Sequence, residues 1–247
     1  MKAVSVLILD YSVDRSEAPL FRRWFPGNCT SSAAYIYFGD SFPDPLEYSH
    51  VIHTGSSLSI CAETDFLEEA EEIVRKCVAE DIPQMGVCYG HQLICRSLLG
   101  PSAIGKCSNG LEAGWIDVEM IGSGLEIPGA APVSRVLQSH FDRVMAIPDT
   151  SEVIAENAHT DIQGFIDREK NLFSLQFHPE FSREEGNELF IKEAKLLEDN
   201  GIDLACILDD GPSIEAGKVF FEYFLNTFEG HRSSSGSRDE RHERSDK

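Results

Sequence analysis

With 247 residues, of which 42% are hydrophobic and 9% aromatic, the chain has the composition of a soluble globular protein with room for one full core. Its formal net charge of −21 would repel phosphate groups, which argues against nucleic acid or an anionic membrane surface as the main partner. The seven cysteines are an odd number without a CxxC pair, so we expect neither a disulfide framework nor a zinc site, and we expect a reducing, cytoplasmic compartment.

Short apolar runs and helical patterns alternate along the first hundred residues. The run at residues 4–9 is too short for a signal peptide or a membrane span, so we interpret it as a buried strand. Residues 65–79 carry apolar positions with a period near 3.6 behind a capping-box-like start. Further runs rich in β-branched and aromatic residues lie at residues 33–38, 51–54 and 85–87. The alternation predicts an α/β fold, with an open, mostly parallel central sheet and helices on both faces.

The pattern changes after residue 114, where short candidate strands are separated by turns. They lie at residues 115–120, 133–137, 144–147, 153–155, 164–166 and 172–176. These strands predict a smaller antiparallel β portion. Two more helices are expected at residues 184–198 and 213–228. The polar segment 230–247 has no apolar residue to anchor it and is predicted to be a disordered tail, which leaves 1–229 as a single domain.

One cysteine lies where a strand pattern gives way to a helix pattern. In "QMGVCYGHQLICRSLLG", residues 84–100, Cys88 stands between Gly86 and Gly90. Flanking glycines permit a sharp turn that exposes a nucleophile and directs backbone N–H groups at a developing oxyanion, and a helix start favours a thiolate. The alternative is a small buried cysteine that packs in a tight turn.

A nucleophilic cysteine needs a base, and "LFSLQFHPEFS" offers one. His178 directly follows a strand pattern, and Glu180 lies two residues later. Because residues i and i+2 of an extended chain project to the same side, Glu180 could hold one ring nitrogen while the other takes the thiol proton. The alternative for His178 is a strand-end histidine followed by a proline that ends the strand.

The two motifs together, "GVCYGHQ" and "LQFHPE" in that order, resemble those of the class I (triad) glutamine amidotransferases. The resemblance implies flavodoxin-like layering and a catalytic triad of Cys88 as nucleophile, His178 as base and acid, and Glu180 as its orienting group. It further implies that Tyr89 supplies an oxyanion N–H and that Gln92 lines the glutamine pocket.

Two further segments are interpreted through the same resemblance. In "HTGSSLSI", Gly55 matches the second glycine of the family's oxyanion turn, whereas Thr54 and Ser56 replace its first glycine and its proline. In "LQSHFDRV", Ser139 and His140 resemble an element near the active site of amidotransferases of the guanylate-synthase type; the alternative is a polar turn.

No cofactor is expected. His50 and His53 form an H-x-x-H without further ligands, so no metal site is predicted, and neither a Walker-type phosphate loop nor a G-x-G-x-x-G is present.

The resemblance implies a cysteine-dependent amide hydrolase that acts on glutamine or a γ-glutamyl compound through a thioester. Ammonia released from glutamine would go to a separate synthetase, because the residues after 185 offer only two helices and a tail. The altered turn at Gly55 keeps a second hypothesis open, a free-standing γ-glutamyl peptidase. A third, a non-catalytic regulator that kept the fold, is disfavoured by intact Cys88, His178 and Glu180.

Overall fold

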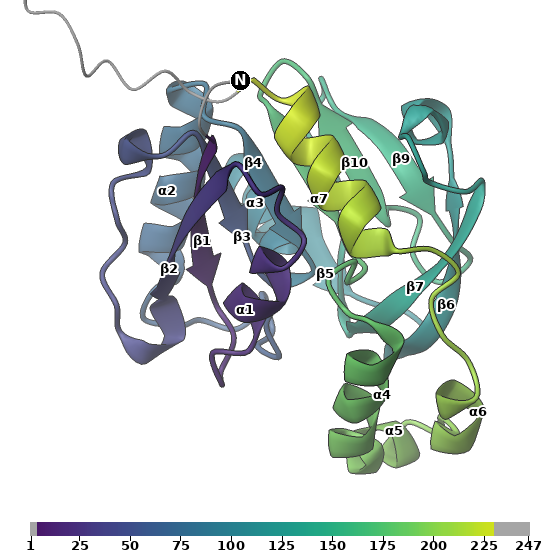
Figure 1. Ribbon diagram of the computed structural model, residues 1–247. Helices are drawn as coiled ribbons and strands as arrows, with labels where there is room; N and C mark the ends of the chain where they lie inside the picture. The colour runs from purple at the N-terminus through teal and green to yellow at the C-terminus, as the bar shows by residue number, and fades with distance from the viewer. Residues whose placement is uncertain (1–3, 230–247) are drawn as a thin grey trace, which may run out of the picture.

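Nine strands form one sheet in the computed structural model, which describes residues 4–229 (Figure 1). They are β1 (Val4–Asp10), β2 (Cys29–Tyr35), β3 (His50–His53), β4 (Gln84–Val87), β6 (Glu112–Met120), β7 (Val133–His140), β9 (Glu152–Glu156), β10 (Gly164–Asp167) and β11 (Leu172–Leu175). Their order across the sheet is β2-β1-β3-β4-β11-β10-β9-β6-β7. The strands from β2 to β11 pair in parallel, and from β11 to β7 the pairing is antiparallel.

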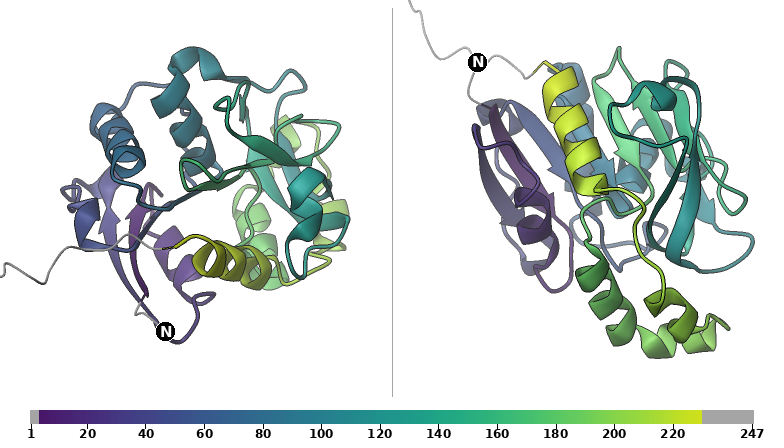
Figure 2. Two further views of the ribbon diagram at one scale, coloured as in Figure 1. Left: turned by 90° about the horizontal axis from the view of Figure 1, so that it is seen from above. Right: turned by 45° about the vertical axis from the view of Figure 1, so that its right-hand side comes forward.

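Helices cover both faces of this sheet (Figure 2). The α-helices are α1 (Glu17–Arg22), α2 (Leu67–Ala79), α3 (Tyr89–Leu99), α4 (Arg183–Lys192), α5 (Ala194–Asp199), α6 (Leu204–Leu208) and α7 (Ala216–Thr227). Four short 3-10 helices lie at Ile36–Phe38, Pro45–Glu47, Pro101–Ala103 and Gly122–Glu126. A separate antiparallel pair is formed by β5 (Ile104–Lys106) and β8 (Asp142–Val144).

The side chains of β1 show why both faces are covered. Val6 and Ile8 belong to the core shared with α1 and α7, whereas Leu7 and Leu9 belong to the core shared with α2 and α3. All four are fully buried. Because successive residues of a strand point to opposite faces, a strand with four consecutive apolar residues needs a cover on each side.

The helix α7 contributes a set of aromatic rings to the first of these cores. Phe220, Phe221 and Phe224 are fully buried, and the ring of Phe221 lies 5.1 Å from that of Phe21 in α1. A third core joins α4, α5 and α6 to strands β6 and β7. These helices lie below the antiparallel half of the sheet in Figure 1.

The predicted α/β class is confirmed, and several element boundaries are corrected. The strand predicted at 33–38 begins at Cys29 and ends at Tyr35, after which a 3-10 helix follows. The strand predicted at 144–147 is misplaced, because β8 spans Asp142–Val144 and residues 145–147 lie outside any strand. The helix predicted at 213–228 begins at Ala216, because a turn joins Ile214 to Ala216.

Two helix predictions fail for identifiable reasons. The helix predicted at 184–198 is divided at Glu193, whose backbone leaves the helical region (φ −91°, ψ 10°) between α4 and α5. The capping box predicted at the start of 65–79 is wrong, because a turn from Thr64 to Leu67 precedes α2 and Phe66 occupies its N-cap. A capping box does occur at the start of α4, at Ser182 and Glu185.

The predicted tail 230–247 lies outside the described residues, so the division into one domain and a tail stays a prediction. All seven cysteines lie within the described part of the chain, and each is unpaired there. Among residues 4–229, every helix is too short or too polar to cross a bilayer.

We expect Phe220→Ala to lower the free energy of unfolding by about 3–5 kcal/mol, because it leaves a cavity between α7 and the sheet. Phe38→Ala is the matched control, since the Phe38 side chain is 44% exposed and contacts the Arg15 guanidinium at the surface; it should cost about 1 kcal/mol or less. Urea unfolding of both variants tests this. Equal losses in the two variants would show that α7 does not organise the core as described.

Candidate active site

The carboxyl ends of the parallel strands bring the predicted residues together. Cys88 follows β4, Gly55 follows β3 after one residue, and His178 and Glu180 follow β11. Because these three strands are neighbours in the order β3-β4-β11, their ends meet at one edge of the sheet. Such an edge is where ligands bind in open α/β sheets.

Cys88 occupies a strained turn between β4 and α3. Its backbone lies at φ 50° and ψ −103°, a conformation that residues with a side chain rarely adopt. A Cβ at Gly86 would lie 2.6 Å from the carbonyl of Gly90, and one at Gly90 would lie 2.2 Å from the carbonyl oxygen of His53. Both flanking glycines are therefore required for the chain to turn so closely.

The ring of His178 is held between a strand and a carboxylate. Its backbone N–H donates to the carbonyl of Leu137 in β7 at 2.9 Å, and its Nδ1 lies 2.5 Å from Oε1 of Glu180. Burial alone would lower the pKa of His178, but the charge of Cys88 and a hydrogen bond with Cys88 outweigh it and raise the pKa, and Glu193 acts in the same direction. A raised pKa favours the imidazolium form beside the Cys88 thiol.

Glu180 is fully buried, and its main chain is anchored by the residues that follow α1. The carbonyl oxygen of Glu180 accepts a hydrogen bond from Nε1 of Trp24 at 2.9 Å and another from the guanidinium of Arg23. Burial raises the pKa of Glu180, and the charge of Arg23 opposes this.

The turn after β3 lies against both the thiol and the imidazole. A Cβ at Gly55 would lie 2.7 Å from Cε1 of His178 and 3.7 Å from Cβ of Cys88. Thr54 braces this turn, because its Oγ1 accepts from the N–H of Tyr11 at 3.0 Å and donates to the carbonyl of Gly55 at 3.0 Å. The Tyr89 N–H belongs to the first residue of α3 and has no acceptor within the helix.

A cavity of about 110 Å³ lies in front of Cys88. Gln92, Ser139 and His140, which were predicted from the sequence, line it together with Asp142. The Nε2 of Gln92 donates to the carbonyl of Asp142 at 2.8 Å and to Oε1 of Gln176 at 3.0 Å, which engages both of its N–H groups within the protein. Gln92 therefore shapes the wall of this cavity through its own hydrogen bonds.

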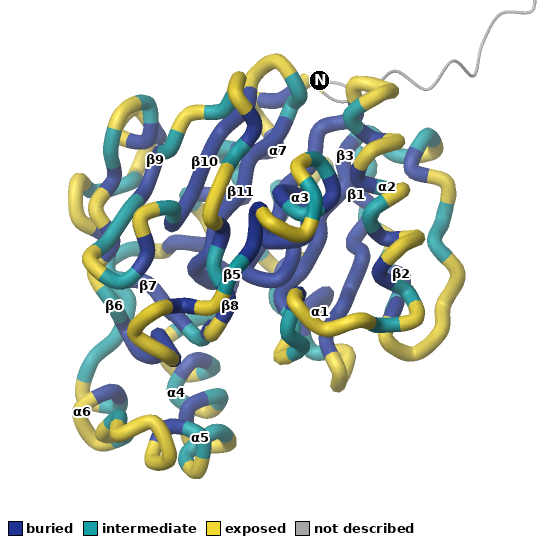
Figure 3. Tube along the Cα trace, turned by 180° about the vertical axis from the view of Figure 1, so that it is seen from behind, coloured by how far each residue is buried: buried dark blue, intermediate teal, exposed yellow. Residues whose placement is uncertain are grey.

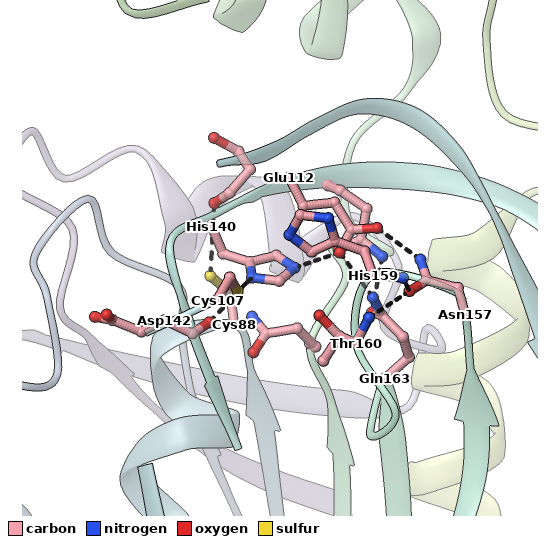
Figure 4. A network of polar contacts seen from close by, with 12 residues as sticks. Cys88, Cys107, Glu112, His140, Asp142, Asn157, His159, Thr160 and Gln163 are labelled. Atoms are coloured by element: carbon pink, nitrogen blue, oxygen red, sulfur yellow. Dashed lines mark hydrogen bonds and ion pairs between the residues drawn. The ribbon is translucent and has the colours of Figure 1, made fainter. Parts of the chain in front are cut away.

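His140 belongs to a polar network behind that wall (Figure 4). Its Nε2 lies 2.9 Å from Oε2 of Glu112, and its Nδ1 lies 3.0 Å from the carbonyl of Asp142. Glu112 also accepts hydrogen bonds from Asn157 at 2.6 Å and Gln163 at 2.9 Å. Despite burial, its hydrogen bonds with His140 and Asn157 lower the pKa of Glu112. The network fixes the β7–β8 corner that faces Cys88.

The two histidines of the H-x-x-H segment have separate partners. His50 contacts Ser49 and the carbonyl of Phe228, whereas His53 contacts Tyr11 and Gln84. Their rings therefore do not share a site.

Three residues at the site, Glu17, Ser57 and Glu193, were not predicted from the sequence. Glu17 and Glu193 line a second cavity of about 380 Å³, which His178 also lines, and Ser57 lines both cavities. Ser139 is shared by the two cavities as well and donates through its Oγ to Glu193 at 3.3 Å. No local pattern marked Glu17 or Glu193, because each meets the site only through tertiary packing.

We expect Gly55→Ala to slow alkylation of Cys88 by at least about tenfold, because the added methyl displaces the ring of His178. The matched control is Gly27→Ala, whose Cβ would meet nothing within 4 Å. The rate of reaction with iodoacetamide and the melting temperature should be measured for both. An unchanged rate in a folded Gly55→Ala protein would contradict the described contact with His178.

The family model described as glutamine amidotransferase class-I matches residues 59–196. A relative from Sulfolobus acidocaldarius, named as a glutamine-hydrolysing subunit of GMP synthase, is 28% identical over 58% of this chain and 74% of its own length. A protein of the same name from Methanococcoides burtonii is 36% identical over 48% of this chain and 62% of its own length, so the match leaves more than a third of that relative uncovered.

Solved structures agree in fold. A glutamine amidotransferase of Thermotoga maritima superposes with a TM-score of 0.74 at 22% identity, over 92% of this chain and 99% of its own. A glutamine amidotransferase of Methylobacillus flagellatus gives 0.72 at 16% identity, over 96% and 99%. With the family model covering more than half of the residues, this chain belongs to the class-I glutamine amidotransferases.

Proposed function

We propose that this chain hydrolyses the side-chain amide of glutamine, with Cys88 as the nucleophile, His178 as the base and acid, and Glu180 as the group that orients His178. The observation that carries the proposal is the meeting of the strained turn at Cys88 with the His178–Glu180 contact of 2.5 Å at one sheet edge. A nucleophile, a base within reach and a third group that orients the base form the arrangement that acyl transfer requires.

The reaction follows from these positions. The Cys88 thiolate attacks the γ-carbonyl carbon, and the Tyr89 N–H together with the turn at Gly55 faces the developing oxyanion. Collapse of the tetrahedral intermediate breaks the C–N bond, while the proton on His178 passes to the leaving nitrogen. Water then attacks the thioester and gives its proton to His178, and glutamate and the Cys88 thiolate are released.

The dimensions and charges of the smaller cavity suit a free amino acid. Its volume of about 110 Å³ is of the order of one short side chain. Lys106 and Asp142, paired at 2.6 Å, both line it. A cation and an anion side by side match the carboxylate and the ammonium of a zwitterion.

We propose a separate synthetase as the acceptor of the ammonia. The support is the name of the relatives from Sulfolobus acidocaldarius and Methanococcoides burtonii, which describes each as a glutamine-hydrolysing subunit of GMP synthase.

A second candidate, hydrolysis of γ-glutamyl peptides, is favoured by the larger cavity. His178, which would protonate the leaving nitrogen, lines this cavity of about 380 Å³, whereas Cys88 lines the smaller one. Ammonia needs no such space, but the amino acid or peptide that leaves a γ-glutamyl compound does.

The two candidates are separated by offering purified protein free glutamine and γ-glutamyl dipeptides side by side. We expect ammonia from glutamine at a rate well above that of amino acid release from the dipeptides, because the paired Lys106 and Asp142 in the smaller cavity suit the charged end groups of a free amino acid. Preferential release of an amino acid would instead assign the peptidase reaction. Release from neither substrate, with or without a synthetase, would contradict both.

Substitution of the triad should give a graded result. Cys88→Ala and His178→Ala should each lower turnover by about four orders of magnitude or more, because nucleophile and base act as a unit. Glu180→Gln should leave roughly 10 to 100 times more turnover than His178→Ala, because it removes only the orienting anion. Cys206→Ala, at an exposed cysteine, is the control and should keep normal turnover. Near-normal activity of folded His178→Ala would shift the role of base to another histidine.

A further inference from the structure

A second buried carboxyl group lies beside the triad. Glu17, the first residue of α1, is 7% exposed, and Glu180 is fully buried. A carboxylate oxygen of Glu17, a ring nitrogen of His178 and a carboxylate oxygen of Glu180 all lie within 4.8 Å of one another. Two carboxylates so close in a buried place cannot both be ionised without strong repulsion.

Each of the two carboxyl groups has one oxygen to spare. Oε1 of Glu180 is taken by Nδ1 of His178, whereas Oε2 of Glu180 is buried without a hydrogen-bond partner among the described residues. Oε2 of Glu17 is likewise buried without a partner in that part of the chain. A proton between the two groups would satisfy both oxygens at once.

The charged residues around the pair do not supply a hydrogen-bond partner for Oε2 of Glu17 or Oε2 of Glu180. Asp10 in β1 faces the pair, but its oxygens accept from Ser12 and from the N–H of Ala18. The guanidinium of Arg23 binds Glu185 of α4 and the main-chain carbonyl of Glu180.

Besides Glu17, the charged groups that act on His178 are Cys88 and Glu193. His178 already uses Nδ1 for Oε1 of Glu180, so it cannot serve the second oxygen. A hydrogen bond from Glu17 is the partner that the geometry leaves for Oε2 of Glu180.

We propose that Glu17 is a positioning residue of the triad: it keeps its proton and donates it in a hydrogen bond to Glu180, which stays an anion toward His178. The inference rests on the roles proposed above for Cys88, His178 and Glu180. Nothing in the family motifs around Cys88 or His178 contains this residue.

Burial raises the pKa of both carboxyl groups, to about 8 for Glu180, and their neighbours decide which of the two keeps its proton. Burial and the neighbouring Glu180 raise the pKa of Glu17 well above its ordinary value, so it holds its proton at neutral pH. The hydrogen bond from Glu17 works against the burial that raises the pKa of Glu180. Donation to the ionised form of a carboxyl group stabilises that form.

The test compares two variants of Glu17 that differ in one property. In Glu17→Gln the amide keeps a donor for Glu180 but cannot ionise, and in Glu17→Leu the volume is similar but no donor remains. Glu184→Leu is the control, because Glu184 is an exposed glutamate in the first turn of α4. The readouts are the pH dependence of Cys88 alkylation, which needs no substrate, and kcat and KM for glutamine.

The rate of Cys88 alkylation falls at low pH, and we call this part of the pH profile the acid limb. In Glu17→Gln and Glu184→Leu, we expect the midpoint of the acid limb to stay within a few tenths of a pH unit of the wild type. Glu17→Leu should move the midpoint of that limb upward by about one pH unit, because Glu180 without a donor is protonated at higher pH and then supports the imidazolium less. Its kcat should fall about tenfold with KM nearly unchanged.

Equal effects of Gln and Leu at position 17 would overturn the inference, since they would mean that an ionised Glu17 acts through its charge. A wild-type acid limb in Glu17→Leu would overturn it as well. If the alkylation profiles follow the expected order while glutamine is not hydrolysed, the inference about Glu17 stands and the proposed substrate fails.

Discussion

The site depends on the parallel pairing of β4 with β11. The register sets Val87 opposite Leu175, and the N–H of Cys88 continues the ladder by donating to the carbonyl of Leu175 at 2.9 Å. Residues almost ninety positions apart in sequence thus leave the sheet at the same point. A shift of this register by one residue would turn every side chain of β11 to the other face of the sheet. The buried core residues of β11 therefore fix the register, and with it the position of His178.

This arrangement places buried charge at the sheet edge, and other elements of the fold balance it. The carbonyl of Glu180 is held by Trp24, whose ring packs so closely on α7 that a Cβ at Gly217 would lie 2.2 Å from it. The aromatic core under α7 and Glu180 therefore share Trp24 as a support. Figure 3 shows that the strands of the central sheet are mostly buried. Damage to that core is expected to reach the chemistry through Trp24, because packed interiors transmit small displacements.

Sequence reasoning succeeded where the information is local. The turn at Cys88 could be predicted because its glycines are neighbours in sequence, and the His178–Glu180 pair because alternate residues of an extended chain share a side. The α/β class followed from strand and helix patterns for the same reason. Gly55 could be placed near Cys88 only through the family resemblance, since its contact with His178 joins different strands.

The features that escaped prediction are set by tertiary contacts. Glu17 resembles any acidic residue at a helix start, and only the return of the chain at Glu180 gives it a neighbour. The break at Glu193 lies inside a continuous helical pattern, yet there the chain bends and the side chain reaches Ser139. The capping box failed because a backbone turn at Thr64 took the place that the side chains would have filled.

The division of the site into two cavities limits how either proposed reaction can run. Cys88 lines the smaller cavity and His178 the larger, and Ser56, Ser57, Ser139 and Glu193 line both. In the proposed reaction, the acyl group bound to Cys88 and the nitrogen protonated by His178 would therefore separate toward different cavities once the C–N bond breaks. The apolar side chains of Leu20, Phe181 and Leu189 line the larger cavity, as expected of a surface that a leaving group or a partner covers. Residues of α1 and α4 line the larger cavity, so in either proposed reaction the molecule that takes the nitrogen would approach from their side, where Glu17 also lies.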